Sequence, residues 1–338
     1  MDKIRLGIMG FGEIGRHLYR SCLEDDKIEV VAISDIGKPE ILHYLLVSLT
    51  NRQIEAKLEG NYLVSKNGRA RMIPGAAPGT VPWDAFGVDY VVDATGIFRS
   101  RAEMQKHLDA GAKRVILSTL PGDDADRIFI TSITDNRITC SDQIISPGSS
   151  TTNAAIIMLK ILDEAFGFDY AMLSTIHAYT ADQPLRDTAG YDFRRSRSAV
   201  ENIIPNTTPS PEWIQKIMPE YRGRIAGTAL NVPVSAGSVL DLTTMLKTTN
   251  INVEEIHKAV EKKAEEYPDI IEVVDDPIVS SDVIGNRHSV IYDKMATMVT
   301  KRRMLKTLTW YHNTYALALR IKEIMLKYDE CDKKGGKK

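Results

Sequence analysis

The feature that most constrains the fold is a glycine-rich segment near the start of the chain, GFGEIG at residues 10–15. It follows the strand-like run RLGIM at residues 5–9 and opens a helix-like run at residues 14–23. In this context the glycines permit a tight turn, close approach of a pyrophosphate and close packing of helix on strand, while the amides at the helix N-terminus hold phosphates. An ordinary tight turn would also use glycine. The surrounding strand and helix nevertheless favour a dinucleotide-binding fold.

A carboxylate at the expected distance supports this interpretation. Asp35 ends the second strand-like run, about 20 residues after Gly15. An acid there can accept hydrogen bonds from ribose hydroxyls and repel a 2′-phosphate, which favours NAD over NADP, although a strand-end cap is the simpler alternative. The segment DATG at residues 93–96 closes another strand, where a ligand or only a turn could lie.

The two halves of the chain differ in pattern. The first alternates β-branched runs with amphipathic stretches, which is typical of βαβ units. After residue 149, a helix-like run over 151–166 precedes longer strand-like segments that predict a mixed or antiparallel sheet. These segments are 169–178, 223–234 and 239–245. A long polar stretch over 179–202 lies between them, and an amphipathic run over 313–328 predicts a final helix with a buried face.

Composition excludes several classes of function. The 338 residues are 43% hydrophobic and 26% charged, which suffices for two globular domains. With 43 basic and 45 acidic residues, no large field favours nucleic acid or a membrane, so the expected partner is a small-molecule substrate. Cys22, Cys140 and Cys331 are widely spaced and odd in number, which fits neither a disulfide framework nor a zinc cluster. We expect a cytoplasmic protein without a metal site.

Six blocks of sequence, in order along nearly the whole chain, resemble the glyceraldehyde-3-phosphate dehydrogenase family. The blocks are GFGEIGR at residues 10–16, ATGIF at 94–98, SSTTN at 149–153, HAYTADQ at 177–183, ENIIP at 201–205 and WYHN at 310–313. The resemblance implies an α/β fold with a Rossmann NAD-binding domain of residues 1–149 and 313–338 and an α+β mixed-sheet catalytic domain of residues 150–312. Its C-terminal helix would return to the first domain. The resemblance also implies NAD as cofactor and a homotetramer, in which the 179–202 loop packs near a neighbouring subunit's cofactor.

The resemblance assigns the catalytic positions to Ser150 and His177. In the family a cysteine attacks an aldehyde, hydride leaves for nicotinamide, and inorganic phosphate releases the acyl group. Here Ser150 stands at the cysteine's position, and its hydroxyl ionises far less readily than a thiol with a pKa of about 8.5. His177 matches the activating histidine and would move the proton, although a histidine at a strand end is also explained as a packed residue.

The remaining site residues follow from the same resemblance. Asn313 matches the asparagine that orients the nicotinamide amide, though it could equally cap a helix. The expected cofactor-binding residues are Gly10, Phe11, Gly12, Glu13, Ile14, Gly15, Asp35, Thr95, Gly96, Ser118 and Asn313. The expected substrate-binding residues are Ser149, Thr151, Thr180, Thr208 and Asn231.

Departures from the family pattern concentrate around the expected substrate. Asn231 replaces an arginine that helps to bind substrate phosphate, so an anion loses a bidentate partner there. Pro209 follows Thr208 where the family has glycine, and proline cannot donate a backbone hydrogen bond. Glu13 and Leu317 replace an arginine and a tyrosine near the cofactor. An engineered change would explain Ser150 alone but not this set, which favours a diverged paralogue.

Three functions remain open from the sequence. The first is an NAD-dependent oxidoreductase acting on a small aldehyde, alcohol or sugar-phosphate-like substrate without the thioester and phosphorylation steps. The second is a phosphorylating glyceraldehyde-3-phosphate dehydrogenase with an engineered cysteine-to-serine change. The third is a catalytically silent NAD-binding or assembly paralogue. The retained His177 and Asn313 favour an active enzyme.

Overall fold

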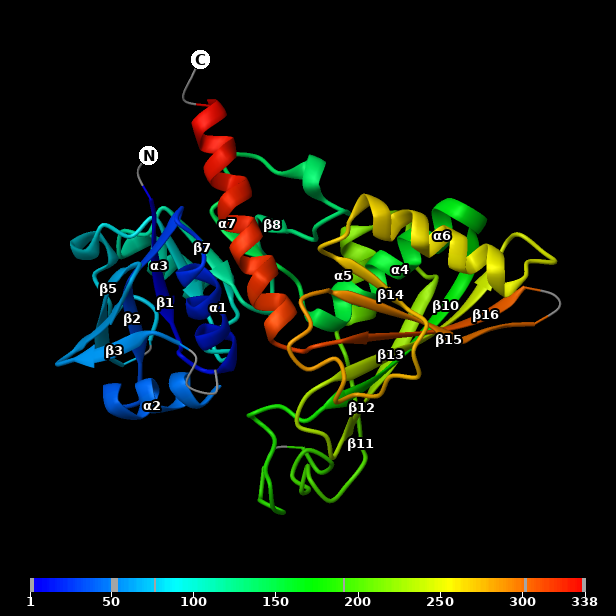
Figure 1. Cartoon of the computed structure of the whole chain (residues 1–338), viewed down its shortest axis with the longest axis horizontal. Coiled ribbons are helices and arrows are strands. Elements are labelled where there is room, and N and C mark those ends of the chain that lie inside the picture. Colours follow the sequence, from blue (N-terminus) through cyan, green and yellow to red (C-terminus); the bar gives the residue numbers. More distant parts are fainter. Residues whose placement is uncertain (1–2, 50–53, 76, 191, 301–302, 336–338) are drawn as a thin grey trace. The chain divides into compact units, whose positions relative to one another are not determined.

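The computed structural model describes residues 3–49, 54–75, 77–190, 192–300 and 303–335 (Figure 1). The chain forms two compact units. The first unit is Met1–Gly148 with Leu317–Lys338, and the second unit is Ser149–Ala316. The first contains a mostly parallel sheet and the second a mixed sheet, which confirms the expected fold class. Within the described residues, no helix is long and apolar enough to cross a membrane.

The described part of the first unit holds a nine-stranded sheet in the order β3-β4-β5-β2-β1-β6-β7-β9-β8. Its strands are β1 (Ile4–Met9), β2 (Ile28–Asp35), β3 (Ala56–Glu59), β4 (Tyr62–Ser65), β5 (Gly68–Pro74), β6 (Tyr90–Asp93), β7 (Arg114–Leu117), β8 (Arg127–Ile128) and β9 (Ile144–Ser146). From β5 to β8 all neighbours are parallel, whereas β3, β4 and β5 form an antiparallel meander. The carboxyl ends of β1, β2, β6 and β7 therefore meet at one sheet edge.

The helices that connect these strands are α1 (Glu13–Leu23), α2 (Pro39–Leu49) and α3 (Arg101–Asp109), with short 3-10 turns η1 (Trp83–Phe86) and η2 (Asp135–Arg137). The C-terminal helix α7 (Tyr315–Gly335) follows the last strand of the chain's second unit. The final helix is longer than expected, and its apolar face, including Ile321, Ile324 and Tyr328, joins the same buried cluster as Leu18 and Tyr19 of α1. Burial of that face stabilises the helix in the first unit.

The expectation that the cysteines form no disulfide is wrong. Cys140 and Cys331 are bonded to each other, with their Cα atoms 5.7 Å apart. The pair is 191 residues apart in the sequence, and only the packing of α7 brings the two positions together, so the spacing could not reveal it. Arg114 reinforces this end of α7, because its guanidinium donates to both carboxylate oxygens of Asp332 at 2.5 and 2.7 Å. Cys22 is buried and unpaired.

The described part of the second unit holds a seven-stranded sheet in the order β11-β12-β10-β13-β16-β15-β14. Its strands are β10 (Phe168–Ala178), β11 (Ile204–Asn206), β12 (Ile225–Val232), β13 (Ser238–Leu246), β14 (Ile271–Val274), β15 (Val290–Val299) and β16 (Met304–Tyr311). The sheet is mixed, since β12 with β10 and β15 with β14 pair parallel, whereas the other neighbours pair antiparallel. The helical elements are α4 (Ser150–Phe166), α5 (Ser210–Ile217), η3 (Pro219–Tyr221) and α6 (Val253–Glu266).

One face of this sheet is covered by α4 and α6 (Figure 1). Almost every residue of α4 from Thr151 to Leu162 is buried, which explains the apolar run AAIIML at residues 154–159. Alternation along β10 places Ala171 and Leu173 inside and leaves Tyr170 and Met172 exposed on the opposite face. The core thus lies between the sheet and α4, and the ends of β10 and α4 hold the residues expected to be catalytic.

Candidate active site

The glycine loop of the first unit has the geometry expected for a dinucleotide site. Gly10 has a φ of +87°, and a Cβ atom there would lie 2.6 Å from the backbone nitrogen of Thr95. A Cβ atom at Gly15 would overlap the carbonyl oxygen of Gly10. Gly12 differs, since its Cβ would meet open space. No side chain caps the N-terminus of α1 at Gly12, so residues and geometry fit the phosphates of NAD.

Asp35 fastens the glycine loop to the end of β2. Its Oδ2 accepts a hydrogen bond from the backbone N–H of Phe11 at 2.6 Å, and its Oδ1 accepts one from Gly37 at 2.8 Å. Each carboxylate oxygen keeps a further lone pair for a ribose hydroxyl. The Phe11 side chain is fully buried and packs edge-on against Tyr19, while Ile14 packs against the same core. Phe11 and Ile14 therefore shape the loop through packing.

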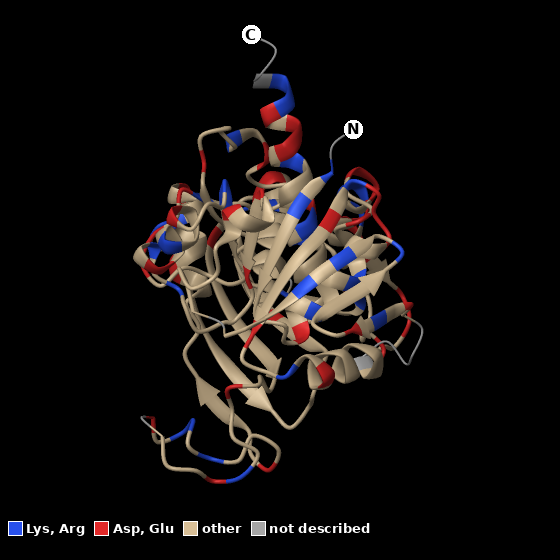
Figure 2. Ribbon diagram, turned by 90° about the vertical axis from the view of Figure 1, so that its left-hand side faces the viewer, with Lys and Arg blue, Asp and Glu red and all other residues tan. Residues whose placement is uncertain are grey.

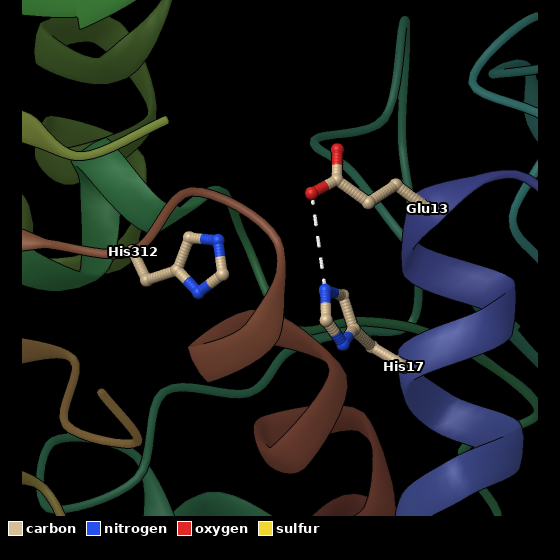
Figure 3. Close-up of side chains that lie close together, drawn as sticks. All are labelled: Glu13, His17 and His312. Atoms are coloured by element: carbon tan, nitrogen blue, oxygen red, sulfur yellow. Dashed lines mark ion pairs between the residues drawn. The ribbon is translucent and has the colours of Figure 1, made fainter. Parts of the chain in front are cut away.

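Glu13 lies at the first position of α1, and its carboxylate turns toward His17 at 3.8 Å (Figure 3). An acid in the first turn of a helix interacts favourably with the helix dipole. It also adds negative charge where a phosphate would bind. His312, drawn in the same figure, accepts a hydrogen bond from the backbone N–H of Gly285 within the second unit.

The other expected cofactor residues of the first unit lie at the carboxyl ends of β6 and β7. Thr95 donates its backbone N–H and its hydroxyl to Asp93 Oδ1, at 3.0 and 2.6 Å. Gly96 has a φ of +70° and is exposed, so it shapes a turn that a side chain would strain. Ser118 is buried and donates its N–H to the carbonyl of Asp93 at 3.0 Å.

In the second unit, Ser150 is the first residue of α4. Ser149 caps this helix, because its Oγ accepts from the backbone N–H of Thr152 at 3.1 Å and lies 2.8 Å from the Thr152 hydroxyl. Within the described residues, the hydroxyl of Ser150 makes no hydrogen bond. Position 150 therefore presents a partly exposed hydroxyl at a helix N-terminus, where developing negative charge is favoured.

His177 lies at the carboxyl end of β10 with a defined tautomer. Its Nδ1 lies 2.6 Å from the carbonyl oxygen of Ala178, and because a carbonyl only accepts, Nδ1 carries the proton. The lone pair is then on Nε2. The amide nitrogen of Asn313 lies at similar distances from both ring nitrogens, 3.1 Å from Nε2 and 3.3 Å from Nδ1. Burial lowers the pKa of His177, although the Ala178 carbonyl and Asp182 partly oppose this shift. The neutral imidazole can accept a proton at Nε2.

Asn313 combines a fixed amide nitrogen with a buried oxygen that lacks a partner. Its Nδ2 also donates to Ser238 Oγ at 2.7 Å, and Ser238 Oγ accepts from the backbone N–H of Ala178 at 3.0 Å. Among the described residues, Asn313 Oδ1 has no hydrogen-bond donor. A buried acceptor of this kind needs a donor, and the carboxamide of nicotinamide can supply one.

Asn231 is buried next to His177, its register partner on the parallel strand β12. Its Oδ1 accepts a hydrogen bond from Asn206 Nδ2 at 3.1 Å. Two neutral amides therefore occupy this part of the strand ends. Such a pair can bind hydroxyl, amide or carbonyl groups but cannot neutralise a phosphate.

The three threonines expected to contact substrate are held by other side chains. Thr151 is buried and lies 2.8 Å from the Tyr311 hydroxyl, and Thr208 donates to Ser210 Oγ at 3.1 Å. Thr180 is exposed and donates to Asp182 at 2.5 Å, which makes it part of a turn. These hydroxyls order the strand and helix ends around His177 and Ser150.

The loop over residues 179–203 contains no helix or strand among its described residues. Basic and acidic residues are interspersed along it (Figure 2). Arg195 pairs with Asp182 at 2.6 Å and Arg197 with Asp187 at 2.9 Å, all largely exposed. These arginines are therefore engaged in local ion pairs of small energetic value.

Sequence reasoning missed three residues that organise this region. Tyr311 is fully buried and its hydroxyl lies 2.7 Å from Thr175 as well as 2.8 Å from Thr151. Ser238 and Asn206 fix the side chains of Asn313 and Asn231. Tyr311 lies inside the WYHN block, so the signal was present; Ser238 and Asn206 become visible only through strand pairing.

Fold and site residues together define a two-domain, NAD-dependent oxidoreductase. Two family models match the chain: residues 4–101 match "Glyceraldehyde 3-phosphate dehydrogenase, NAD binding domain" and residues 149–313 match "Glyceraldehyde 3-phosphate dehydrogenase, C-terminal domain". The chain belongs to the glyceraldehyde-3-phosphate dehydrogenase family, and its cofactor is NAD.

Similarity to individual members extends over nearly the whole chain. The glyceraldehyde-3-phosphate dehydrogenase of Borreliella burgdorferi is 36% identical over 337 residues, covering 96% of this chain and 99% of the relative. The enzymes named so from Mycobacterium leprae and Mycobacterium tuberculosis are 37% and 39% identical, each covering 95% of this chain and 97% of the relative. The family resemblance seen in the six sequence blocks is confirmed.

Proposed function

We propose that this protein transfers hydride between NAD and a small aldehyde, alcohol or sugar-phosphate-like substrate without forming a thioester and without phosphorylating the product. The observation that carries this proposal is that a serine hydroxyl stands at the nucleophile position while the histidine that would act as base is retained. Ser150 presents a hydroxyl at the N-terminus of α4, while His177 keeps a neutral Nε2 at the end of β10. A serine hydroxyl needs strong base assistance to attack a carbonyl, whereas direct hydride transfer needs only a proton acceptor.

The chain's own residues supply the proton chemistry of this reaction. When bound, NAD accepts or returns the hydride. In alcohol oxidation, His177 Nε2 accepts the hydroxyl proton while the C–H bond breaks and a carbonyl forms; in reduction the same nitrogen returns the proton. Ser150 would donate a hydrogen bond to the substrate oxygen, and Asn313 Oδ1 would accept one from the nicotinamide carboxamide. The Asn206 and Asn231 amides receive the other end of the substrate.

The test is a turnover screen of purified protein with NAD or NADH and a panel of small aldehydes, alcohols and sugar phosphates, with and without inorganic phosphate. We expect turnover that does not depend on phosphate. Ser150→Ala should keep a measurable part of this rate, because no covalent intermediate forms on residue 150. Trapping of an acyl-enzyme on Ser150, or a rate that requires phosphate, would contradict the proposal.

A second candidate is phosphorylating oxidation of glyceraldehyde 3-phosphate, the reaction that the relatives' name describes. The observation in its favour is the start of α4, since a helix N-terminus lowers the pKa of a thiol placed there. Ser150→Cys would then restore phosphate-dependent NADH formation from glyceraldehyde 3-phosphate. Absence of any gain in this variant would remove the second candidate.

A silent NAD-binding or assembly protein is the third candidate, and the neutral Asn206–Asn231 pair supports it because an unneeded substrate site tolerates loss of charge. It predicts NAD binding without turnover in the whole screen. Turnover of any member of the panel, abolished by His177→Gln, would exclude it.

The assembly we propose is a homotetramer in the cytoplasm. Exposed apolar side chains on the uncovered face of the second unit's sheet support it, since Tyr170 and Met172 are 66% and 56% exposed in the single chain. Sedimentation velocity should give the mass of four chains. The double variant Tyr170→Lys with Met172→Lys should sediment as smaller species. If the wild type and the double variant both sediment as monomers, the proposed assembly is contradicted.

A further inference from the structure

A buried chain of hydrogen bonds runs from the interior of the first unit to the carboxyl end of β6, where we propose that NAD binds. The indole N–H of Trp83, in η1, donates to Nδ1 of His107, in α3, at 3.1 Å. His107 Nε2 lies 3.3 Å from Asp93 Oδ2, at the end of β6. Asp93 Oδ1 in turn accepts from the backbone N–H and the hydroxyl of Thr95. Trp83, His107 and Asp93 are each completely buried.

The direction of this chain is fixed by its first member. An indole N–H can only donate, so His107 Nδ1 must be the unprotonated acceptor. The ring proton is then on Nε2, where it faces the acceptor-only carboxylate of Asp93. Thr95 also donates to that carboxylate. Each group in this series of hydrogen bonds is thus fixed as a donor or as an acceptor. If one of them changed between donor and acceptor, a buried donor would face another donor.

The turn that Asp93 holds is packed against the glycine loop. The backbone N–H of Ala94 donates to the carbonyl of Met9 at 2.7 Å, and Gly10 approaches Thr95 so closely that a Cβ atom would lie 2.6 Å from its nitrogen. Ser118 donates its N–H to the Asp93 carbonyl at 3.0 Å. A displacement of Asp93 would therefore move Thr95 and the neighbouring wall of the glycine loop together.

We propose that Trp83, His107 and Asp93 are positioning residues for NAD, in which the tautomer imposed by Trp83 keeps Asp93 as an acceptor and so holds the Thr95 turn in its cofactor-binding conformation. This inference rests on the proposed placement of NAD at the ends of β1, β2 and β6. None of the three residues touches the cofactor in this scheme. They act through Thr95 and Gly10.

A double-mutant cycle tests the donor and acceptor roles directly. In Asp93→Asn, one amide group must satisfy both Thr95 and His107. If its oxygen faces Thr95, its N–H₂ faces the Nε2–H of His107, and the indole prevents the imidazole from moving its proton. We expect the Kd for NAD to rise about tenfold or more. Trp83→Phe alone removes only the indole donor, and we expect a rise of about two- to fivefold.

The double variant Trp83→Phe with Asp93→Asn should bind NAD more tightly than Asp93→Asn alone. Without the indole N–H, the His107 proton can move to Nδ1, and Nε2 can then accept from the amide introduced at position 93. We expect at least about a threefold recovery of affinity. ¹⁵N NMR of the ring should show the Nε2–H tautomer in the wild type and the Nδ1–H tautomer in the double variant.

Several outcomes would overturn the inference. They are a double variant that binds NAD as weakly as Asp93→Asn or more weakly, an Nδ1–H tautomer in the wild type, or unchanged NAD affinity in variants that only lose stability in urea. Trp213→Phe, in the second unit, is the matched control, since this tryptophan is 8% exposed and carries Lys216 over its ring. Its NAD affinity should equal the wild type's. Turnover is not part of this readout, so a wild-type protein that binds NAD but converts no substrate would contradict the proposed reaction alone.

Discussion

The two units place different chemistry at the carboxyl ends of their strands. In the first unit, Asp35 and Asp93 are carboxylates that fix backbone N–H groups of Phe11 and Thr95. In the second, the side chains around His177 are the neutral amides of Asn231 and Asn313, which are bonded to Asn206 and to the hydroxyl of Ser238. The first site therefore depends on backbone geometry that few residues can satisfy, whereas the second depends on side chains that can be exchanged without altering the fold. The proposed NAD site of the first unit can therefore persist while the residues around His177 in the second unit change.

The largest effect that would test this difference between the two units is expected when His177 is replaced. In His177→Gln, loss of the proton acceptor should reduce the rate of hydride transfer by about 10²- to 10⁴-fold, with little change in the Kd for NAD. Steady-state kinetics and NAD titration measure the two quantities. The matched control is His257→Gln, because His257 is also buried in the second unit but bonds the Tyr292 hydroxyl. Equal losses of rate in both variants would show that His177 acts through folding.

The next effect is on the stability that the disulfide bond of the first unit provides. Reduction of Cys140–Cys331, or the double change Cys140→Ser with Cys331→Ser, should lower the free energy of unfolding by about 2–4 kcal/mol, because the unfolded chain loses a long closed loop. Urea unfolding with and without a dithiol measures it. A dithiol should have no effect on the double-serine variant, and an equal effect there would locate the sensitivity elsewhere.

A pair of glycine variants separates folding from cofactor binding. Gly10→Ala should lower stability by about 1–3 kcal/mol, since residue 10 has a positive φ and its Cβ would meet the Thr95 backbone. Gly12→Ala meets open space, so its stability should change by less than about 0.5 kcal/mol while NAD binding weakens. Thermal unfolding and NAD titration give the two readouts. Tight NAD binding by Gly12→Ala would place the phosphates elsewhere.

The smallest expected effect is on the pH dependence. Burial lowers the pKa of His177, so its folded-state proton affinity is below the ordinary value of about 6.5. The neutral base needed for oxidation then persists at lower pH, and the acid limb of kcat/KM should lie below about pH 6.5. In the window between the lowered pKa and the ordinary one, the unfolded chain binds more protons, so His177 reduces stability as pH falls. An acid limb above the ordinary value would contradict this assignment.

The sequence was sufficient for the parts that depend on local backbone geometry. The glycine loop, the placement of Asp35 at the end of β2 and the helix after Ser149 lie where the pattern predicted them. The sequence also placed His177 at the end of a strand. These features have short-range causes, namely positive φ values, strand alternation and a helix cap.

Long-range pairing escaped the sequence. The Cys140–Cys331 bond joins positions 191 residues apart, and the contact of Asn206 with Asn231 depends on β11 pairing with β12. The contact of Thr151 with the Tyr311 hydroxyl likewise joins positions 160 residues apart. Composition and spacing carry no information on which distant strands become neighbours.

The way α4 begins has a practical consequence for chemical labelling. Ser149 caps the helix, so its start does not depend on the side chain at position 150. The chain's three cysteines are poor targets, because Cys140 and Cys331 are bonded to each other and burial raises the pKa of Cys22 to about 12. A cysteine introduced at position 150 would be the single reactive thiol of the oxidised protein. An alkylating fluorophore could then report from this helix terminus without modification elsewhere.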